Sequence, residues 1–238
     1  MQTYPFLTLA IVLISFVAMG CNEESSNDFP NANLIMEPDE AWIFNNETGV
    51  ENPDITFNAT ESSDPDGEIR NYHYEYGEGN FTDLPGNTHT RTYTVPGYFR
   101  PKLTVSDNDG DTDSVTQTLT VNYRYFRGTQ PLGDATGTAD EREHPFPISE
   151  FHAFSGIVTV EIQSTGIETP NANVTVMNEA GDVVAFEQED TINGNVTIVI
   201  NLQKQDFEQY EHGEWNVVVA CENGSITYDA TIEIIYKD

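Results

Sequence analysis

Hydrophobic and polar residues alternate over short stretches from Leu34 to the end of the chain, and this period of two is typical of strands with one buried face. Gly, Pro, Asn and Asp recur between these stretches every eight to twelve residues or so, which is about the spacing of turns between antiparallel strands. No long stretch with helical periodicity interrupts the pattern. The sequence therefore predicts an all-β fold.

The first half of the chain has alternating stretches that suit a sandwich of two sheets, each with one apolar face. Their apolar positions are Ile55 and Phe57; Tyr72, Tyr74 and Tyr76; Phe99, Leu103 and Val105; and Val115, Leu119 and Val121. We expect a first β-sandwich over residues 32–122.

The second half repeats the pattern and predicts a further β-sandwich of seven or eight strands over residues 148–238. Its apolar positions are Val158, Val160 and Ile162; Val174 and Val176; Val196, Ile198, Ile200 and Leu202; and Ile226, Tyr228, Ala230, Ile232 and Ile234. A turn is expected at residues 179–182, after the second of these stretches.

The region between the two sandwiches, residues 123–147, lacks periodicity over most of its length and is rich in Gly, Thr and Pro. It is either a linker or a first strand, and Tyr123 to Arg127 could pair with either domain. Tyr123, Tyr125 and Phe126 are expected to pack between the domains rather than to meet a ligand.

Four motifs in register resemble the PKD domain over residues 32–122: SSDPDGEI from Ser62, YEYGEG from Tyr74, TYTVPGYF from Thr92 and LTVSDNDGD from Leu103. The resemblance implies an immunoglobulin-like sandwich that serves as an extracellular module. It also implies that Asp64, Pro65 and Gly67 form a turn rather than contribute to a catalytic pair of carboxylates.

Two departures from the PKD pattern are informative. Tyr74 stands where the family has the central Trp of its core, so its hydroxyl needs a hydrogen-bond partner or a route to the surface. Pro101 stands where the family has Val, and since proline cannot donate a ladder hydrogen bond, we expect it at a sheet edge or bulge.

The second sandwich more loosely resembles the pre-peptidase C-terminal (PPC) type of accessory domain. The resemblance rests on NEAGD from Asn178, GEWNVVV from Gly213 and ITYDATIEI from Ile226. It implies a jelly-roll or PPC-like sandwich.

The N-terminus resembles a lipoprotein signal. An apolar run over residues 5–19 is too short to span a bilayer comfortably, and it ends just before Gly20 and Cys21, the expected lipidation site of a signal peptide covering residues 1–21. Met19 and the absence of Lys or Arg at the start depart from that pattern, so a cleaved secretory signal and an uncleaved anchor stay open. Polar residues 22–31 are expected to be a flexible tether, and all three alternatives place the domains outside the cytoplasm.

Forty acidic residues against nine basic ones give a net charge of −31, spread over both halves of the chain. This charge argues against nucleic acid and anionic lipid as partners, because both require Lys and Arg. Self-repulsion of this size is relieved by salt, so the composition indicates a halophilic or marine source.

No catalytic motif is present: the five histidines are scattered, and HExxH and GxSxG are absent. The sequence therefore favours a protein that is not an enzyme. Cys221, on the apolar face of a strand, is expected to be a buried and unreactive thiol.

A calcium site is the one cofactor site that the sequence suggests. Asp107, Asp109, Asp111 and Asp113 alternate around Gly110 and could direct carboxylate oxygens at Ca²⁺. The EF-hand order is not met, so a solvated turn is the alternative.

Six Asn-x-Ser/Thr sites are glycosylation candidates in a secreted chain: Asn46, Asn58, Asn80, Asn173, Asn195 and Asn223. The whole pattern favours an exported, surface-anchored interaction or adhesion module that binds proteins or glycans. The alternative is an accessory subunit of a secreted peptidase or glycosidase.

Overall fold

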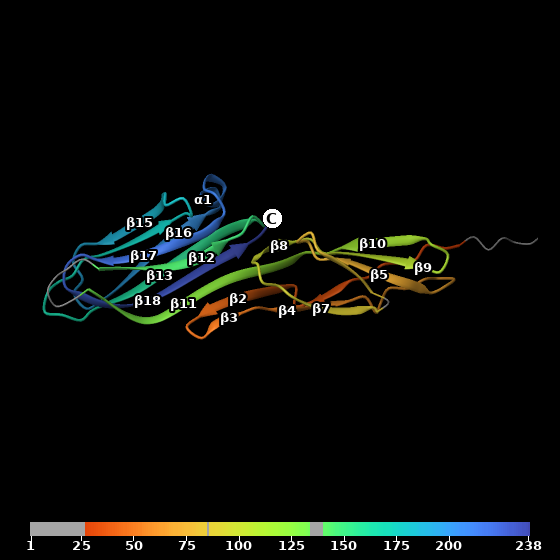
Figure 1. Cartoon of the computed structure of the whole chain (residues 1–238), viewed down its shortest axis with the longest axis horizontal. Coiled ribbons are helices and arrows are strands. Elements are labelled where there is room, and N and C mark those ends of the chain that lie inside the picture. Colours follow the sequence, from red (N-terminus) through yellow and green to blue (C-terminus); the bar gives the residue numbers. More distant parts are fainter. Residues whose placement is uncertain (1–26, 85, 134–139) are drawn as a thin grey trace, which may run out of the picture.

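The computed structural model describes residues 27–84, 86–133 and 140–238. These residues form eighteen strands and one short helix, which confirms the predicted all-β fold. Two β-sandwiches lie end to end, the first at the right of Figure 1 and the second at the left. No helix in these ranges is long and apolar enough to cross a membrane. The expected signal peptide, Cys21 and residues 22–26 of the expected tether lie outside the described residues.

The first sandwich packs a three-stranded sheet against a four-stranded one, both antiparallel. The three-stranded sheet has the order β1 (Ile35–Glu37), β4 (Asp54–Asn58) and β7 (Thr88–Thr92). The four-stranded sheet has the order β10 (Thr112–Thr116), β9 (Lys102–Asp107), β5 (Ile69–Glu75) and β6 (Phe81–Leu84).

A seven-stranded sheet runs through both halves of the molecule. Its order is β16 (Asn195–Gln203), β13 (Ala153–Ser164), β18 (Ser225–Tyr236), β11 (Leu119–Gly133), β2 (Glu40–Asn46) and β3 (Gly49–Glu51), and β8 (Gly97–Phe99) pairs with the start of β11. A four-stranded sheet covers its inner face, with the order β12 (Asp140–Ile148), β17 (Gly213–Cys221), β14 (Ala172–Met177) and β15 (Val183–Glu189).

The long strand β11 joins the two sandwiches (Figure 1). It pairs in parallel with β2 of the first sandwich and, through the same residues, antiparallel with β18 of the second. Tyr123, for example, lies opposite both Ile43 and Ile234. The described part of residues 123–147 therefore consists of strands. Tyr123 to Tyr125 pair with both β2 and β18, whereas Phe126 and Arg127 pair with β18 alone.

Aromatic side chains fill the core of the first sandwich. Phe57 lies edge-on to Tyr74 and Tyr76, with ring centroids 6.2 and 5.2 Å apart. The hydroxyl of Tyr93 donates a 2.9 Å hydrogen bond to the carbonyl of Tyr76. The hydroxyls of Tyr74 and Tyr76 are buried and make no hydrogen bond within the described part of the chain, so the partner expected for Tyr74 is not found. Burial raises the pKa of Tyr74 to about 12.

Pro101 lies in the break between β8 and β9, where the chain leaves the seven-stranded sheet for the four-stranded sheet of the first sandwich. It is buried, and its carbonyl accepts a 2.9 Å hydrogen bond from Gln117. Pro101 thus lies at a change of sheet rather than at the expected edge or bulge. At such a break, as at an edge, no ladder hydrogen bond is required from the proline nitrogen.

The helix α1 (Lys204–Gln209) was not predicted, because six residues are too few to show a helical period. The Asp206 carboxylate accepts a 2.7 Å hydrogen bond from the backbone N–H of Gln203 and so caps the first turn. Phe207 of the helix stacks on Trp215 of β17, with centroids 5.6 Å apart. The helix thus closes one end of the second core.

Cys221 ends β17 with its side chain fully buried and without a disulfide partner within the described ranges. Burial raises the pKa of its thiol. The expectation of a buried thiol is confirmed.

Candidate functional site

The face of the seven-stranded sheet turned away from the β12–β17–β14–β15 sheet, here called the outer face, is open to solvent. On β13 the apolar side chains of Val158 and Val160 point inward and are fully buried. Ile157, with 43% of its surface exposed, and Glu161 point outward. The outer face is therefore available to a partner along several strands.

Six polar residues form two rows across three neighbouring strands of the outer face, and we call them the polar grid. Thr197, Glu161 and Asp229 make one row, and Asn195, Gln163 and Thr227 make the next, on β16, β13 and β18 respectively. Together with Thr129, which lies in the irregular stretch of β11, they line a hollow of about 310 Å³. All seven residues carry a hydroxyl, amide or carboxylate, and none is basic.

Two carboxylates meet in the grid. Glu161 lies directly opposite Asp229 in the antiparallel pair of β13 and β18, where like charges destabilise a sheet. The Oδ1 atom of Asp229 is buried and makes no hydrogen bond with any described residue. A buried acceptor without a donor costs free energy that a donor from a ligand would recover. The site is therefore suited to a ligand with several hydroxyl or amino donors.

Aromatic side chains lie on the same face, and one of them, Phe126, is close to the grid. Trp42 and Phe44 of β2 are stacked, with centroids 6.4 Å apart and planes inclined by 21°. Phe44 is 39% exposed, and Phe126 of β11 is 46% exposed. Phe126 lies opposite Thr231, two residues along β18 from Asp229, a step of roughly 7 Å. Phe126 was expected to pack between the domains, but only its neighbours Tyr123 and Tyr125 are buried there.

Only two of the four carboxylates predicted to bind calcium come together: Asp107 and Asp111 both accept hydrogen bonds from Asn27 Nδ2, at 3.1 and 2.9 Å. Asp107 Oδ1 accepts hydrogen bonds from the backbone N–H groups of Asp109, Gly110 and Asp111, at 2.6 to 2.9 Å. Asp113 accepts one from the backbone of Ala32. No three Asp, Glu, His or Cys side chains of the described residues are arranged as metal ligands.

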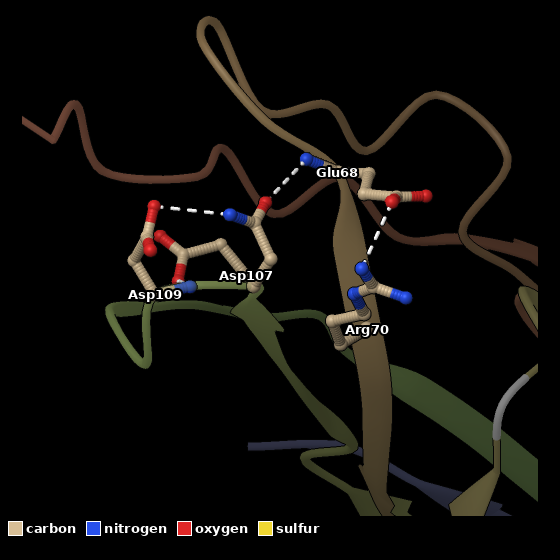
Figure 2. Close-up of polar contacts among 5 residues, drawn as sticks. Glu68, Arg70, Asp107 and Asp109 are labelled. Atoms are coloured by element: carbon tan, nitrogen blue, oxygen red, sulfur yellow. Dashed lines mark hydrogen bonds and ion pairs between the residues drawn. The ribbon is translucent and has the colours of Figure 1, made fainter.

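Asn108 connects this loop to the turn before β5. Its Oδ1 accepts a 2.8 Å hydrogen bond from the Glu68 backbone N–H, and its Nδ2 donates one of 3.0 Å to Asp109 (Figure 2). Glu68 also pairs with Arg70 at 3.0 Å. A Cβ on Gly67 would collide with Asn108 Oδ1, so only glycine allows this close approach.

Asp64, from the same turn, is the carboxylate most in need of a partner. Both of its oxygens are shielded from solvent and make no hydrogen bond with a described residue. Burial raises the pKa of Asp64, and the charges of Asp66 and Asp107 raise it further against a partial offset from the nearby Asp66 N–H. At Asp107 burial acts the same way, but hydrogen bonds from Asn27 and from the loop backbone outweigh it and lower the pKa. Calcium binding stays a prediction for this end of the molecule, with Asp64 added to the candidate ligands.

The six candidate glycosylation sites differ in exposure. Asn80, Asn195 and Asn223 are exposed, whereas Asn46, Asn58 and Asn173 are half-buried. The side-chain nitrogens of Asn173 and Asn223 already donate hydrogen bonds, to Glu222 and Asn171. Glycosylation stays a prediction at all six.

The polar grid could not be predicted from the sequence, because its members are far apart in the chain. The alternation of polar with apolar residues over residues 157–163, 195–202 and 226–234 shows which side chains point outward. It does not show which strands are neighbours, and that order brings Glu161 and Asp229 together.

Comparison with known proteins identifies the first sandwich: residues 36–123 match the PKD domain, so this part of the chain is a PKD domain. A segment of 102 residues is 31% identical to collagenase ColA of Clostridium perfringens and spans 43% of this chain but only 9% of that collagenase. The resemblance of the second sandwich to PPC domains stays a prediction.

Solved structures are also similar to this chain. The PKD1 domain of the metalloprotease PrtV of Vibrio cholerae is 30% identical over 40% of this chain and 98% of its own, with a TM-score of 0.31. A structure described among carbohydrate-binding modules of the β-sandwich superfamily is 15% identical, covering 89% of this chain and 98% of its own, with a TM-score of 0.37.

Proposed function

We propose that this protein is an exported, non-catalytic module that binds a neutral glycan on the outer face of the seven-stranded sheet. The observation that carries the proposal is the polar grid. An Asp229 oxygen in its hollow has no partner among the described residues, and the exposed ring of Phe126 lies beside it.

A glycan suits this surface on three counts. Sugar hydroxyls are donors for the carboxylates of Glu161 and Asp229 and partners for the amides and hydroxyls around them. The apolar faces of sugar rings can pack on exposed aromatic rings such as Phe126 and Phe44. The acidic grid would repel a negatively charged glycan, which favours a neutral one.

Attachment to the cell surface is the second part of the proposal. Cys21, in its lipoprotein-like signal, would carry the lipid, and residues 22–31 would hold the domains off the membrane. The native protein should then sediment with membranes, and its mass should exceed that of residues 21–238 by a lipid. A Cys21→Ser variant that stays membrane-bound would contradict lipidation.

An accessory role beside a secreted peptidase is the second candidate, favoured by the identity with collagenase ColA. Such a module would bind the peptidase's protein substrate rather than a glycan. Cosedimentation of the protein with insoluble collagen, unaffected by changes in the polar grid, would support this candidate.

The deciding experiment is a screen of immobilised glycans and proteins at about 0.15 M and 0.5 M NaCl, because salt screens the net charge. We expect a neutral oligosaccharide to bind, and Glu161→Ala with Asp229→Ala to weaken binding at least tenfold or so, since each removes a hydrogen bond to a charged group. Glu187→Ala with Asp190→Ala removes the same charge from exposed positions at β15 and should leave binding unchanged. Equal losses in both variants would overturn the assignment.

A further inference from the structure

A second pocket lies on the opposite side of β11 from the outer face, where the two sandwiches meet, and we call it the junction pocket. It has a volume of about 360 Å³ and is lined by residues of β2, β11 and β12. Tyr125 and Arg127 alternate onto the inner face of β11, and Asn45 lies opposite Tyr125 on β2. His144 and Arg142 share the inner face of β12.

Its two arginines are exceptional in so acidic a chain. Six of the nine basic residues lie within 4.0 Å of a carboxylate: Arg70, Arg91, Arg100, Lys102, Arg124 and Lys204. Arg127, Arg142 and Lys237 have no such partner among the described residues, and of these three the two arginines line the junction pocket.

Each arginine donates one hydrogen bond within the protein, from its Nε atom. Arg127 donates from Nε to the Tyr125 hydroxyl at 3.3 Å, and Arg142 donates from Nε to the Pro131 carbonyl at 3.2 Å. Their terminal Nη groups make no hydrogen bond with another described residue. Each guanidinium is thus positioned while its terminal donors are left for a ligand.

The buried side of the pocket is a chain of hydrogen bonds. The Tyr125 hydroxyl lies 2.9 Å from His144 Nδ1, and His144 Nε2 lies 2.8 Å from the Tyr228 hydroxyl. Burial, followed by the charges of Arg127 and Arg142, lowers the pKa of His144 to about 4. Near neutral pH the imidazole is therefore uncharged, and the positive charge of the pocket comes from its arginines.

Two acids lie near the pocket without forming an ion pair with its arginines. Glu143 belongs to the pocket lining, but strand alternation turns its side chain to the face of β12 opposite Arg142 and His144. Glu47 accepts a 3.1 Å hydrogen bond from the Gly128 backbone. It is not within 4.0 Å of Arg127, but after the hydrogen bond to Tyr125 its charge contributes to the raised pKa of that side chain.

We propose that the junction pocket binds the carboxylate of a uronic acid, held by Arg127 and Arg142. Guanidinium groups match a carboxylate with paired N–H donors. The net charge of −31 penalises a dianion such as phosphate about twice as much as a monoanion, which favours a carboxylate.

The remaining lining groups suit the sugar ring. The side-chain nitrogens of Asn45 and Gln130 donate within the protein, to the Tyr123 hydroxyl and the Gly128 carbonyl. Their carbonyl oxygens make no hydrogen bond with another described residue and would accept from ring hydroxyls. The volume is of the size that holds a small ligand.

Titration calorimetry with glucuronate, glucose, acetate and phosphate, in chloride salts free of other carboxylates, tests the proposal. Glucuronate should bind more tightly than glucose, which lacks the carboxylate, and more tightly than acetate, which lacks the ring. Phosphate binding as tightly as glucuronate would show a general anion site and overturn the assignment to a uronate, as would equal binding of glucose.

Variants locate the site. Arg127→Gln and Arg142→Gln should each weaken the affinity for glucuronate at least about tenfold. The affinity of Arg142→Lys should fall between those of wild type and Arg142→Gln, because lysine keeps the positive charge but lacks the paired N–H donors of the guanidinium. Arg70→Gln, an exposed arginine of β5, is the matched control and should bind as wild type does. Unchanged affinity in both glutamine variants, with melting temperatures close to wild type, would overturn the proposal. Should either glutamine variant unfold, the folded Arg142→Lys variant is measured instead: weaker glucuronate binding than in wild type supports the proposal, and unchanged binding overturns it.

Glucuronate binding in the Glu161→Ala, Asp229→Ala protein should be unaffected, because these residues lie on the outer face and not in the junction pocket.

Discussion

The Oδ1 atom of Asn122 accepts a 3.0 Å hydrogen bond from the backbone N–H of Tyr236, so the end of β18 is fixed to β11. The Nδ2 atom of the same side chain donates a 3.0 Å hydrogen bond to Glu40 at the start of β2. Asn122 is fully buried. One side chain thus connects the last strand of the second sandwich with the first sandwich, across the strand that both share.

The shared strand predicts that the two sandwiches unfold together. Asn122→Ala removes both hydrogen bonds and leaves the Tyr236 N–H buried without a partner, so we expect a loss of about 2–4 kcal/mol in the free energy of unfolding. Calorimetry should show one transition for wild type, moved to lower temperature in the variant. Asn201→Ala, at an exposed position of β16, should change little. Two well-separated transitions in wild type would contradict this coupling.

The tyrosines of the first core should respond differently to loss of the hydroxyl. Tyr93→Phe removes the hydrogen bond to the Tyr76 carbonyl and should cost about 1 kcal/mol. Tyr74→Phe removes a buried hydroxyl that has no described partner, so stability should be unchanged or rise by about 1 kcal/mol. Urea unfolding of both variants checks the contrast. A larger loss for Tyr74→Phe than for Tyr93→Phe would mean that the Tyr74 hydroxyl has a partner.

His144 should make stability depend on pH. Its pKa is lowered to about 4 from 6.5, so on acidification the unfolded chain takes up this proton first. Stability is therefore lost as the pH falls from 6.5 towards 4. Between pH 7 and pH 5 the loss should be about 2 kcal/mol greater in wild type than in His144→Gln, in which the other acids titrate alike. Parallel curves for the two proteins would show that His144 is not buried in its neutral form.

Asp64 should destabilise the folded chain near neutral pH unless a cation binds. Its pKa is raised in the folded state, so its contribution favours folding at acid pH and is lost as the pH rises. Asp64→Asn should raise the melting temperature in calcium-free buffer, and millimolar calcium should raise that of wild type only. A lower melting temperature for Asp64→Asn without calcium would show that the carboxylate is needed for the turn.

Alternation and turn residues predicted most strands because they report local geometry. Val158, Val160 and Ile162 are buried as expected, and the turn before β15 lies where Gly181 and Asp182 indicate. The sharing of β11 was not predictable, because its pairing with β2 and β18 joins residues about 80 and 110 positions apart, and local pattern carries no such information. For the same reason, neither the polar grid nor the pocket that Arg127 and Arg142 line could be predicted. The alternating acids predict calcium ligands within one loop, whereas the carboxylate most in need of a partner, Asp64, comes from another.

Backbone amide chemical shifts during titration with the neutral oligosaccharide selected by the screen test the central claim most directly. The account predicts saturable shifts at Glu161, Gln163, Thr197 and Asp229, extending to Phe126, and none on β14 or β15. Shifts confined to the first sandwich, or to the β12–β17–β14–β15 sheet, would contradict it.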